Sequence, residues 1–296
     1  MGVNEKKGRV ATVGTFDGLH RGHRKVIETV NSIAGNKNLK PLAVCFDRHP
    51  LETIAPERAP GFIQAPSERI NALYREGFEI LTLEFNHATA GLTAEEWLTM
   101  MRDRHGVDTL VVGYDNTFGS DGIQMSIHDY QALGRRLGME VVEAPIQPGV
   151  SSSAIRRLIA SGDIEGATQM LGHPYTMTGE VAHGKGLGSR IGVPTANLRL
   201  PYRAQLPANG VYAAEAILPD GSVHKAVVNI GVRPTVDTNG EKSIEAHIIG
   251  FNGDIYGQRL TLKLIRKLRD EKRFDSLEGL QRQIQEDIVS MSDGGA

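Results

Sequence analysis

Two histidines and three glycines lie close together near the start of the chain, between Gly14 and His23. The glycines, at 14, 18 and 22, let phosphate oxygens approach the main chain. His20 and His23 are three residues apart, so on a helix they share one face and can donate to one phosphate. This arrangement suits the charge that develops on an α-phosphate during nucleotidyl transfer. Histidines at a helix start also serve simply as capping or surface residues, so the pair alone does not establish a phosphate-binding site.

The predicted elements around this motif favour the chemical interpretation. The apolar run 10–13 predicts a strand, and Val26, Ile27 and Val30 predict a helix that follows it. The motif then occupies the turn between a strand and a helix N-terminus, where backbone N–H groups bind anions.

Further polar residues follow other predicted strands of the first half. His49 comes after the apolar run 42–46, and Asp115 comes after the run 109–113. Strands that alternate with helices predict a doubly wound parallel α/β sheet, whose ligands bind at the carboxyl ends of the strands. We expect these two residues and the histidine motif to meet in one crevice. The serines and the arginine at the next helix start, Ser152, Ser153 and Arg156, suit a triphosphate, although serine-rich helix starts are common.

The second half of the chain has a glycine-rich loop that can wrap phosphates. Its candidate phosphate-binding residues are Gly184, Lys185, Gly186 and Arg190. Such loops are often mere connections. The extended segment after it places the Thr195 hydroxyl and the Asn197 amide on one side, where they can coordinate Mg²⁺ bound to a nucleotide.

Glu245 is a carboxylate within the apolar run 244–249. Strand alternation can simply turn such a residue to solvent. The alternative is a partly buried general base that accepts a proton from an attacking hydroxyl beside a metal-bound phosphate.

The pattern of predicted elements changes near residue 171, from alternating strands and helices to short β-type runs. This change predicts two domains, 1–170 and 171–296. After this point short β-type runs around Val181 and Val193 and at 210–214, 226–230 and 244–249 alternate with glycine and proline, which predicts a small antiparallel β-barrel. An apolar stripe from Leu277 to Ile288 predicts a C-terminal helix, and we interpret the stripe as core packing rather than a cofactor site.

Charge and cysteine content narrow the classes of protein. The formal net charge of −2 gives no argument for nucleic acid or an anionic membrane. We expect small-molecule partners and a monomer or weak homo-oligomer. The single cysteine, Cys45, lies in an apolar run and fits a buried thiol in a reducing cytoplasm. Residues 1–7 lack the apolar core of a signal peptide, and no apolar run approaches the ~20 residues of a membrane span.

The motifs resemble two known families. The stretch 14–23 resembles the nucleotidyltransferase signature in the form typical of bacterial FAD synthetases, and 151–156 is similar to the segment that completes the ATP site there. The second half resembles riboflavin kinases at 194–197, 207–212, 229–235, 254–257 and 268–271. Nearly the whole chain thus resembles the bifunctional bacterial riboflavin kinase/FAD synthetase family: an α/β nucleotidyltransferase domain followed by a small β-barrel kinase domain with a C-terminal helix.

The resemblance implies that the second domain converts riboflavin and ATP to FMN and ADP, and that the first converts FMN and ATP to FAD and pyrophosphate. In the kinase domain it implies that Glu245 activates a ribityl hydroxyl and that Arg269 lies near the flavin. In the first domain it implies that His20 and His23 stabilise the α-phosphate while the FMN phosphate attacks directly. It also implies ATP contacts from Gly14, Thr15, Phe16, Asp17, Gly18, Ser152, Ser153 and Arg156, and a crevice lined by His49 and Asp115.

One departure from the family pattern affects the first domain. Asn116 stands where an aromatic residue is common in the family. The absence of an aromatic ring at this position weakens the expected stacking on the flavin. Two alternatives stay open: a kinase with a degenerate first domain, which Asn116 favours weakly and the His20/His23 pair disfavours, and a flavin- or nucleotide-binding regulator without turnover, which Glu245 disfavours. Paired histidines also occur in class I aminoacyl-tRNA synthetases, but this chain has no lysine-rich signature loop or basic excess for tRNA.

Overall fold

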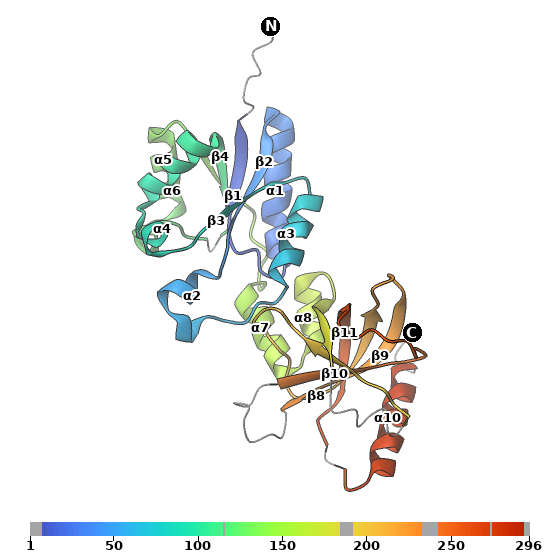
Figure 1. Ribbon diagram of the computed structural model, residues 1–296. Helices are drawn as coiled ribbons and strands as arrows, with labels where there is room; N and C mark the ends of the chain where they lie inside the picture. Colours follow the sequence, from blue (N-terminus) through green and yellow to red (C-terminus); the bar gives the residue numbers. More distant parts are fainter. Residues whose placement is uncertain (1–7, 115, 184–191, 233–241, 273, 293–296) are drawn as a thin grey trace. The chain divides into compact units, whose positions relative to one another are not determined.

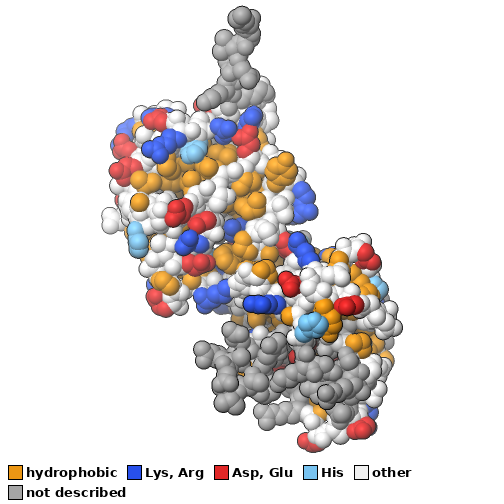
Figure 2. Space-filling view, in the orientation of Figure 1, with side chains coloured by type: hydrophobic (Ala, Val, Ile, Leu, Met, Phe, Trp, Pro, Cys, Tyr) orange, Lys and Arg blue, Asp and Glu red, His pale blue; other side chains and the backbone are white. Residues whose placement is uncertain are grey.

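The computed structural model describes residues 8–114, 116–183, 192–232, 242–272 and 274–292. The contacts divide the chain into two compact units, one of residues 1–60 and 66–150, the other of residues 61–65 and 151–296. On the face shown in Figure 2, basic and acidic side chains are interspersed within each unit. This agrees with the balanced charge of the sequence.

The first unit contains a five-stranded parallel sheet in the order β3-β2-β1-β4-β5. Its strands are β1 (Arg9–Val13), β2 (Lys40–Phe46), β3 (Glu79–Leu83), β4 (Val107–Val112) and β5 (Glu140–Glu143). Strands β1, β2 and β4 match the runs 10–13, 42–46 and 109–113 predicted from the sequence, with small differences at the ends. The chain order reverses between β1 and β4, and ligands of doubly wound sheets bind at the carboxyl ends of strands at such a point.

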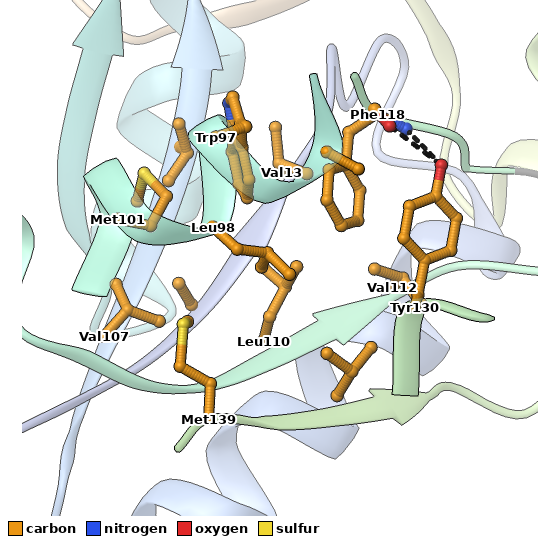
Figure 3. Close-up of a cluster of buried hydrophobic side chains, with 14 of the residues drawn as sticks. Val13, Trp97, Leu98, Met101, Val107, Leu110, Val112, Phe118, Tyr130 and Met139 are labelled. Atoms are coloured by element: carbon orange, nitrogen blue, oxygen red, sulfur yellow. Dashed lines mark hydrogen bonds between the residues drawn. The ribbon is translucent and has the colours of Figure 1, made fainter. Parts of the chain in front are cut away.

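Helices cover both faces of this sheet (Figure 1). The longer helices are α1 (Arg21–Lys37), α3 (Pro66–Arg75), α5 (Ala94–His105) and α6 (Ile127–Arg136), and the short ones are α2 (Pro50–Ile54) and α4 (His87–Gly91). Residues of α1 and α3 pack in one buried cluster, and residues of α5 and α6 in the other. Figure 3 shows the second cluster, in which Trp97, Leu98 and Met101 of α5 lie over the sheet. The sequence analysis had not placed α2, α4 or α6.

The second unit contains a closed antiparallel barrel in the order β10-β7-β6-β11-β8-β9. Its strands are β6 (Tyr175–Ala182), β7 (Ala196–Arg199), β8 (Gly210–Ile217), β9 (Val223–Val232), β10 (Lys242–Ile248) and β11 (Arg259–Arg269). The predicted barrel is therefore present. The strand expected at Val193 is wrong: this residue is buried but precedes β7 in a non-strand segment. Burial, not strand pairing, explains its apolar character.

Three further elements belong to the barrel unit. Helix α7 (Ser152–Ser161) packs against α8 (Ile164–Leu171), and α8 contacts β6 and β11. Helix α10 (Leu277–Ser292), as the stripe predicted, contacts β9 and β11. The compact units therefore do not coincide with the predicted boundary after residue 170, because α7 and α8 pack with the barrel.

A short segment from the first half of the chain also belongs to the barrel unit. The Phe62 N–H donates to the Arg203 carbonyl at 2.8 Å, and the Gln205 N–H donates to the Phe62 carbonyl at 2.8 Å. Arg156 of α7 donates from Nε to the Gly61 carbonyl at 3.0 Å. These bonds tie residues 61–65 to both α7 and the barrel.

Candidate functional site

The turn after β1 has an unusual backbone. Phe16 and Leu19 have φ angles of +48° and +41°, and Gly18 has +80°. Left-handed conformations cost side-chain-bearing residues about 1–2 kcal/mol each and cluster at functional sites. Phe16 and Leu19 are buried in the α1-side cluster, and the Gly14 N–H donates to the Val44 carbonyl at 3.1 Å. Packing on both sides therefore holds the turn in its strained shape.

His20 and His23 lie together at the start of α1, as their spacing predicted. His20 is the N-cap residue, and its Nδ1 accepts the His23 N–H at 3.3 Å, which places the proton of a neutral His20 on Nε2. The two imidazoles are stacked, with ring centroids 3.7 Å apart. The His23 ring also meets the edge of Phe16 at 5.4 Å. The pair thus forms one rigid group at a helix N-terminus.

The three glycines of the motif have different structural roles. Only Gly18 needs a positive φ angle. A Cβ at Gly22 would lie 3.1 Å from the His20 ring, whereas a Cβ at Gly14 would make ordinary contact with Phe16 at 3.5 Å. Gly22 therefore gives His20 room.

The loop after β4 lies next to the same turn. Asn116 donates from its side-chain nitrogen to the carbonyl of Val13, the last residue of β1. Phe118 exchanges two hydrogen bonds with the Tyr130 hydroxyl, at 3.1 and 2.8 Å (Figure 3). The loop is therefore fixed to the β1 end and to α6. Asp115, the predicted flavin contact within it, lies outside the described residues.

His49 caps a helix at the end of the segment after β2. Its Nδ1 accepts the Leu51 N–H at 3.2 Å, and Glu52 accepts the His49 N–H at 3.3 Å, which completes a capping box for α2. Any contact with a flavin stays a prediction.

The predicted triphosphate contacts of α7 lie in the barrel unit. Ser151 caps α7 by accepting the Ala154 N–H at 3.2 Å, and Ser152 and Ser153 form its first turn. Ser153 is exposed, and Arg156 bonds to Gly61 as described above. Their role toward ATP stays a prediction.

In the barrel, strand register brings polar residues of distant motifs into one row. Asn197 of β7 pairs with Glu245 of β10, and Glu245 pairs with Asn229 of β9. Asn229 pairs with Val211 of β8, which pairs with Arg269 of β11. Directly paired residues of an antiparallel sheet have their side chains on the same face. Glu245 therefore has a carboxamide on each side.

Two cavities adjoin this row. The first, which we call the helix-side cavity, has a volume of about 260 Å³ and is lined by Glu245, Asn229 and Arg269 together with Leu280, Ile284 and Asp287 of α10. The second, the loop-side cavity, has a volume of about 150 Å³ and is lined by Pro194, Asn252, Asp254 and Tyr256 among others.

Thr195 lines both cavities. Glu245, which is half-buried, has no hydrogen bond or ion pair to any other described side chain. Asn197 is only 8% exposed and is likewise without a hydrogen-bond partner for its side chain in the described part of the chain. Thr195 and Glu245 therefore contribute a hydroxyl and a carboxylate to the helix-side cavity, and the amide of Asn197, which lines neither cavity, belongs to a residue paired with Glu245 in the strand row.

The helix stripe has a role that the sequence analysis missed. Leu280 and Ile284 line the helix-side cavity, so the interpretation of the stripe as core packing only is wrong for these two residues. The 3.6-residue period signals a buried face but not whether a cavity lies beneath it. Asn229 and Asp287 were also missed as site residues, although Asn229 lay within a quoted motif.

The glycine-rich loop lies in the sequence between Val181 and Pro194, two residues that line the loop-side cavity. Its candidate phosphate-binding residues, Gly184, Lys185, Gly186 and Arg190, lie outside the described residues. His183, just before them, stacks on Tyr256 of the loop-side cavity with ring centroids 3.9 Å apart. Among the described residues, no group of three or more His, Cys, Asp or Glu side chains forms a metal site.

Comparisons with known proteins match both units. A family model for FAD synthetase matches residues 3–154, and one for riboflavin kinase matches residues 171–293. The bifunctional riboflavin kinase/FMN adenylyltransferase of Pseudomonas fluorescens is 35% identical over 290 residues, which cover 97% of this chain and 93% of that protein. The protein of the same name from Bacillus subtilis is 33% identical over 289 residues, covering 96% and 91%.

A crystal structure from Streptococcus pneumoniae, described as a macrolide-efflux protein, is also similar. It has a TM-score of 0.88 and 31% identity, and the match covers 100% of this chain and 96% of that one. The two family models match the two units and the curated relatives match nearly the whole chain, so the chain belongs to the bifunctional riboflavin kinase/FMN adenylyltransferase family.

Proposed function

We propose that the barrel unit phosphorylates riboflavin and that the first unit adenylylates the FMN so formed. The observation that carries the kinase proposal is the position of Glu245 on the wall of the helix-side cavity. Thr195 lines this cavity too, and it also lines the loop-side cavity. Riboflavin is assigned to the helix-side cavity, whose apolar wall of Val193, Leu280 and Ile284 suits a flat ring. ATP is assigned to the loop-side cavity.

In this arrangement Glu245 accepts the proton of a ribityl hydroxyl. The hydroxyl oxygen then forms a bond to the γ-phosphorus of ATP while the bond to the β-phosphate oxygen breaks, giving FMN and ADP. The half-buried carboxylate without an ion-pair partner among the described residues is suited to this role, because nothing competes for its proton-accepting oxygens.

Mg²⁺ fits the same site, with Thr195 and Asn197 as its protein ligands. Oxygen ligands from a hydroxyl and a carboxamide, completed by water and phosphate, are typical of magnesium sites with a nucleotide. The unpartnered side chain of Asn197, on the face shared with Glu245, supports this assignment. When bound, the ion would neutralise phosphate charge.

In the first unit, His20 and His23 stabilise negative charge on the α-phosphate of ATP. The FMN phosphate is already an anion, so the residues need to position and stabilise rather than activate it. The stacked imidazoles at the α1 N-terminus and the strained turn support this role. Asp17 and Gly18 of the turn would approach the phosphates.

Single variants test the two sites separately. Glu245→Gln is expected to abolish phosphorylation of riboflavin and to leave the conversion of FMN to FAD at the parent rate. His23→Ala is expected to stop at FMN. Flavins separated by chromatography after incubation with ATP and Mg²⁺ give both readings. Parent activity retained in either variant would contradict the corresponding assignment.

The proposal also covers the cellular compartment and the oligomeric state. We propose a cytoplasmic protein that acts as a monomer or weak homo-oligomer on small molecules. The single, buried Cys45 supports a reducing compartment. Within the described residues there is no helix with the length and apolar character of a membrane span.

A further inference from the structure

The C-terminal helix contributes a buried carboxylate to the helix-side cavity. Asp287 of α10 is 4% exposed, and both of its oxygens accept from Arg269: Oδ1 from Nε at 2.8 Å, and Oδ2 from Nη2 at 2.8 Å. This bidentate geometry is the strongest form of an arginine–carboxylate pair. Gln283, one turn earlier on α10, donates to the same Oδ1 at 3.3 Å. Asp287 is thus itself held by its helix.

These contacts fix the direction of the Arg269 guanidinium. Its Nη1 donates to the Asp270 carbonyl at 3.0 Å, and its central carbon lies 5.9 Å from the centroid of the Phe274 ring. A guanidinium has five N–H groups, and Asp287 and Asp270 together use three. No other described residue accepts from the remaining two, on Nη1 and Nη2. Arg269 therefore presents one free edge while the other is clamped.

The pair also separates two opposite charges within one cavity. Arg269 and Glu245 line the same space, and they lie on the same face of the barrel row. A guanidinium released from Asp287 would be attracted to Glu245, whose carboxylate has no ion-pair partner among the described residues. Pairing with Glu245 would remove a proton acceptor. Because Asp287 is already paired with Arg269, the guanidinium does not pair with Glu245.

Stability alone does not account for this pair. Burying an ion pair is costly, and well-packed apolar residues often replace one without loss. The neighbouring cavity residues Leu280 and Ile284 show that the helix already has an apolar contact surface here. The charged pair is better explained by the chemistry of the cavity.

We propose that Asp287 is a positioning residue for riboflavin phosphorylation: it aims the free N–H edge of Arg269 at the ligand and keeps the guanidinium away from Glu245. The ligand chemistry is that of a flat, neutral heteroaromatic ring whose carbonyl oxygens accept N–H bonds. This inference rests on the assignment of riboflavin to the helix-side cavity, and it makes α10 part of the kinase site.

The test compares Asp287→Asn with the parent in the full-length protein. Riboflavin binding is measured without ATP, by quenching of flavin fluorescence, and the steady-state constants are measured for both substrates. The expected result is a Kd and a KM for riboflavin raised by about tenfold or more, with the KM for ATP nearly unchanged. Conversion of FMN to FAD, which uses the first unit, stays at the parent rate, and the unchanged KM for ATP in the kinase reaction reports that the barrel unit is folded.

The matched control is Glu278→Gln, an exposed acid of the same helix that has no hydrogen bond to Asp287, Arg269 or Gln283, and this variant is expected to bind riboflavin like the parent. A second variant, Arg269→Leu with Asp287→Leu, separates positioning from simple stabilisation of the helix. It is expected to melt near the parent temperature and still bind riboflavin weakly. Recovery of parent binding in this double variant would show that the pair is structural only and would overturn the proposal.

An unchanged Kd in Asp287→Asn would overturn it as well. Failure of the proposed function looks different: the parent protein would bind riboflavin without phosphorylating it. The binding titration would then still decide whether Asp287 positions Arg269.

Discussion

At the scale of single residues, the structure explains why particular side chains stand beside the reactive groups. His20 has its orientation set by an N-cap bond and by stacking on His23, and its space is made by a glycine. These are supports that act through geometry rather than by touching a substrate. Their removal should therefore change one activity and leave the other unaltered.

Gly22→Ala tests this for the adenylyltransferase site. The new Cβ lies 3.1 Å from the His20 ring, so the ring must shift by a few tenths of an ångström. We expect the rate of FAD formation from FMN to fall by about tenfold, because displaced catalytic groups lose rate steeply. The kinase rate should be unchanged. Gly35→Ala is the control on the same helix, since its Cβ meets no atom within 4 Å; an equal loss in both variants would contradict the account.

The side chain of Asn116 makes a specific hydrogen bond to the Val13 carbonyl across the β1–β4 reversal. Asn116→Ala is expected to destabilise the loop by about 1 kcal/mol and to raise the KM for FMN in adenylylation. Riboflavin phosphorylation should not change. Kinetics of both reactions in the one variant measure this, and an unaltered KM for FMN would show that the bond does not position the site.

Cys45 provides a pH-dependent prediction. Burial raises the pKa of its thiol from 9.0 to about 11, against the opposing charge of Arg69. The native thiol should therefore resist alkylation at pH 8, whereas the unfolded chain should react with one equivalent of reagent. A raised pKa in the folded state adds stability that is complete below pH 9 and is lost as pH rises toward 11. Rapid labelling of the native protein would contradict the burial of Cys45.

At the scale of elements, the joint between residues 61–65 and the barrel is the least expected feature. Gly61 lies against the backbone of the segment before β8, and a Cβ there would be 2.6 Å from both the Ala204 carbonyl oxygen and the Gln205 nitrogen. Backbone atoms of a paired segment have little freedom to move. The crossing segment is therefore a structural part of the barrel unit.

Gly61→Ala is expected to destabilise that unit by about 1–3 kcal/mol, through overpacking against the backbone. Calorimetry should show a lower melting temperature for the barrel unit, which is identified as the transition that riboflavin shifts upward. Gly91→Ala, whose Cβ meets no atom within 4 Å, serves as the control. Equal melting temperatures for the parent and Gly61→Ala would show that the segment is not tightly packed.

The sequence predicted the elements that carry a strong local signal. The strands expected at 10–13, 42–46 and 109–113, the barrel class and α10 are present, because apolar runs and helical stripes reflect burial directly. It missed β7 and β11, since β7 is only 4 residues long and five of the 11 residues of β11 are Lys or Arg. The docking of 61–65 on the barrel depends on contacts far apart in sequence, which local patterns do not encode.

The candidate site shows the same division. The spacing of His20 and His23 predicted their proximity, because they share one turn of a helix. The row from Asn197 through Glu245 to Arg269 depends on the register of four strand pairings. The helical period of α10 does not show which strand residue lies opposite Asp287. The sequence therefore contained no sign that Asp287 pairs with Arg269.

At the scale of the whole molecule, the central claim is that one chain carries two separate sites acting in sequence on a flavin. The residues proposed for the kinase reaction lie in the barrel unit, and the stacked histidines proposed for adenylylation lie in the sheet unit. If the sites are independent, a defect in one unit leaves the other fully active. Two chains with different defects should then complement each other in solution.

The most direct measurement is a mixing experiment with riboflavin, ATP and Mg²⁺. His23→Ala should accumulate FMN, and Glu245→Gln should leave riboflavin unconverted, so neither protein makes FAD alone. An equimolar mixture should make FAD, because FMN released by the first variant is adenylylated by the second. Loss of both activities in either single variant, or no FAD from the mixture when the parent forms it readily, would contradict the assignment of two separate sites.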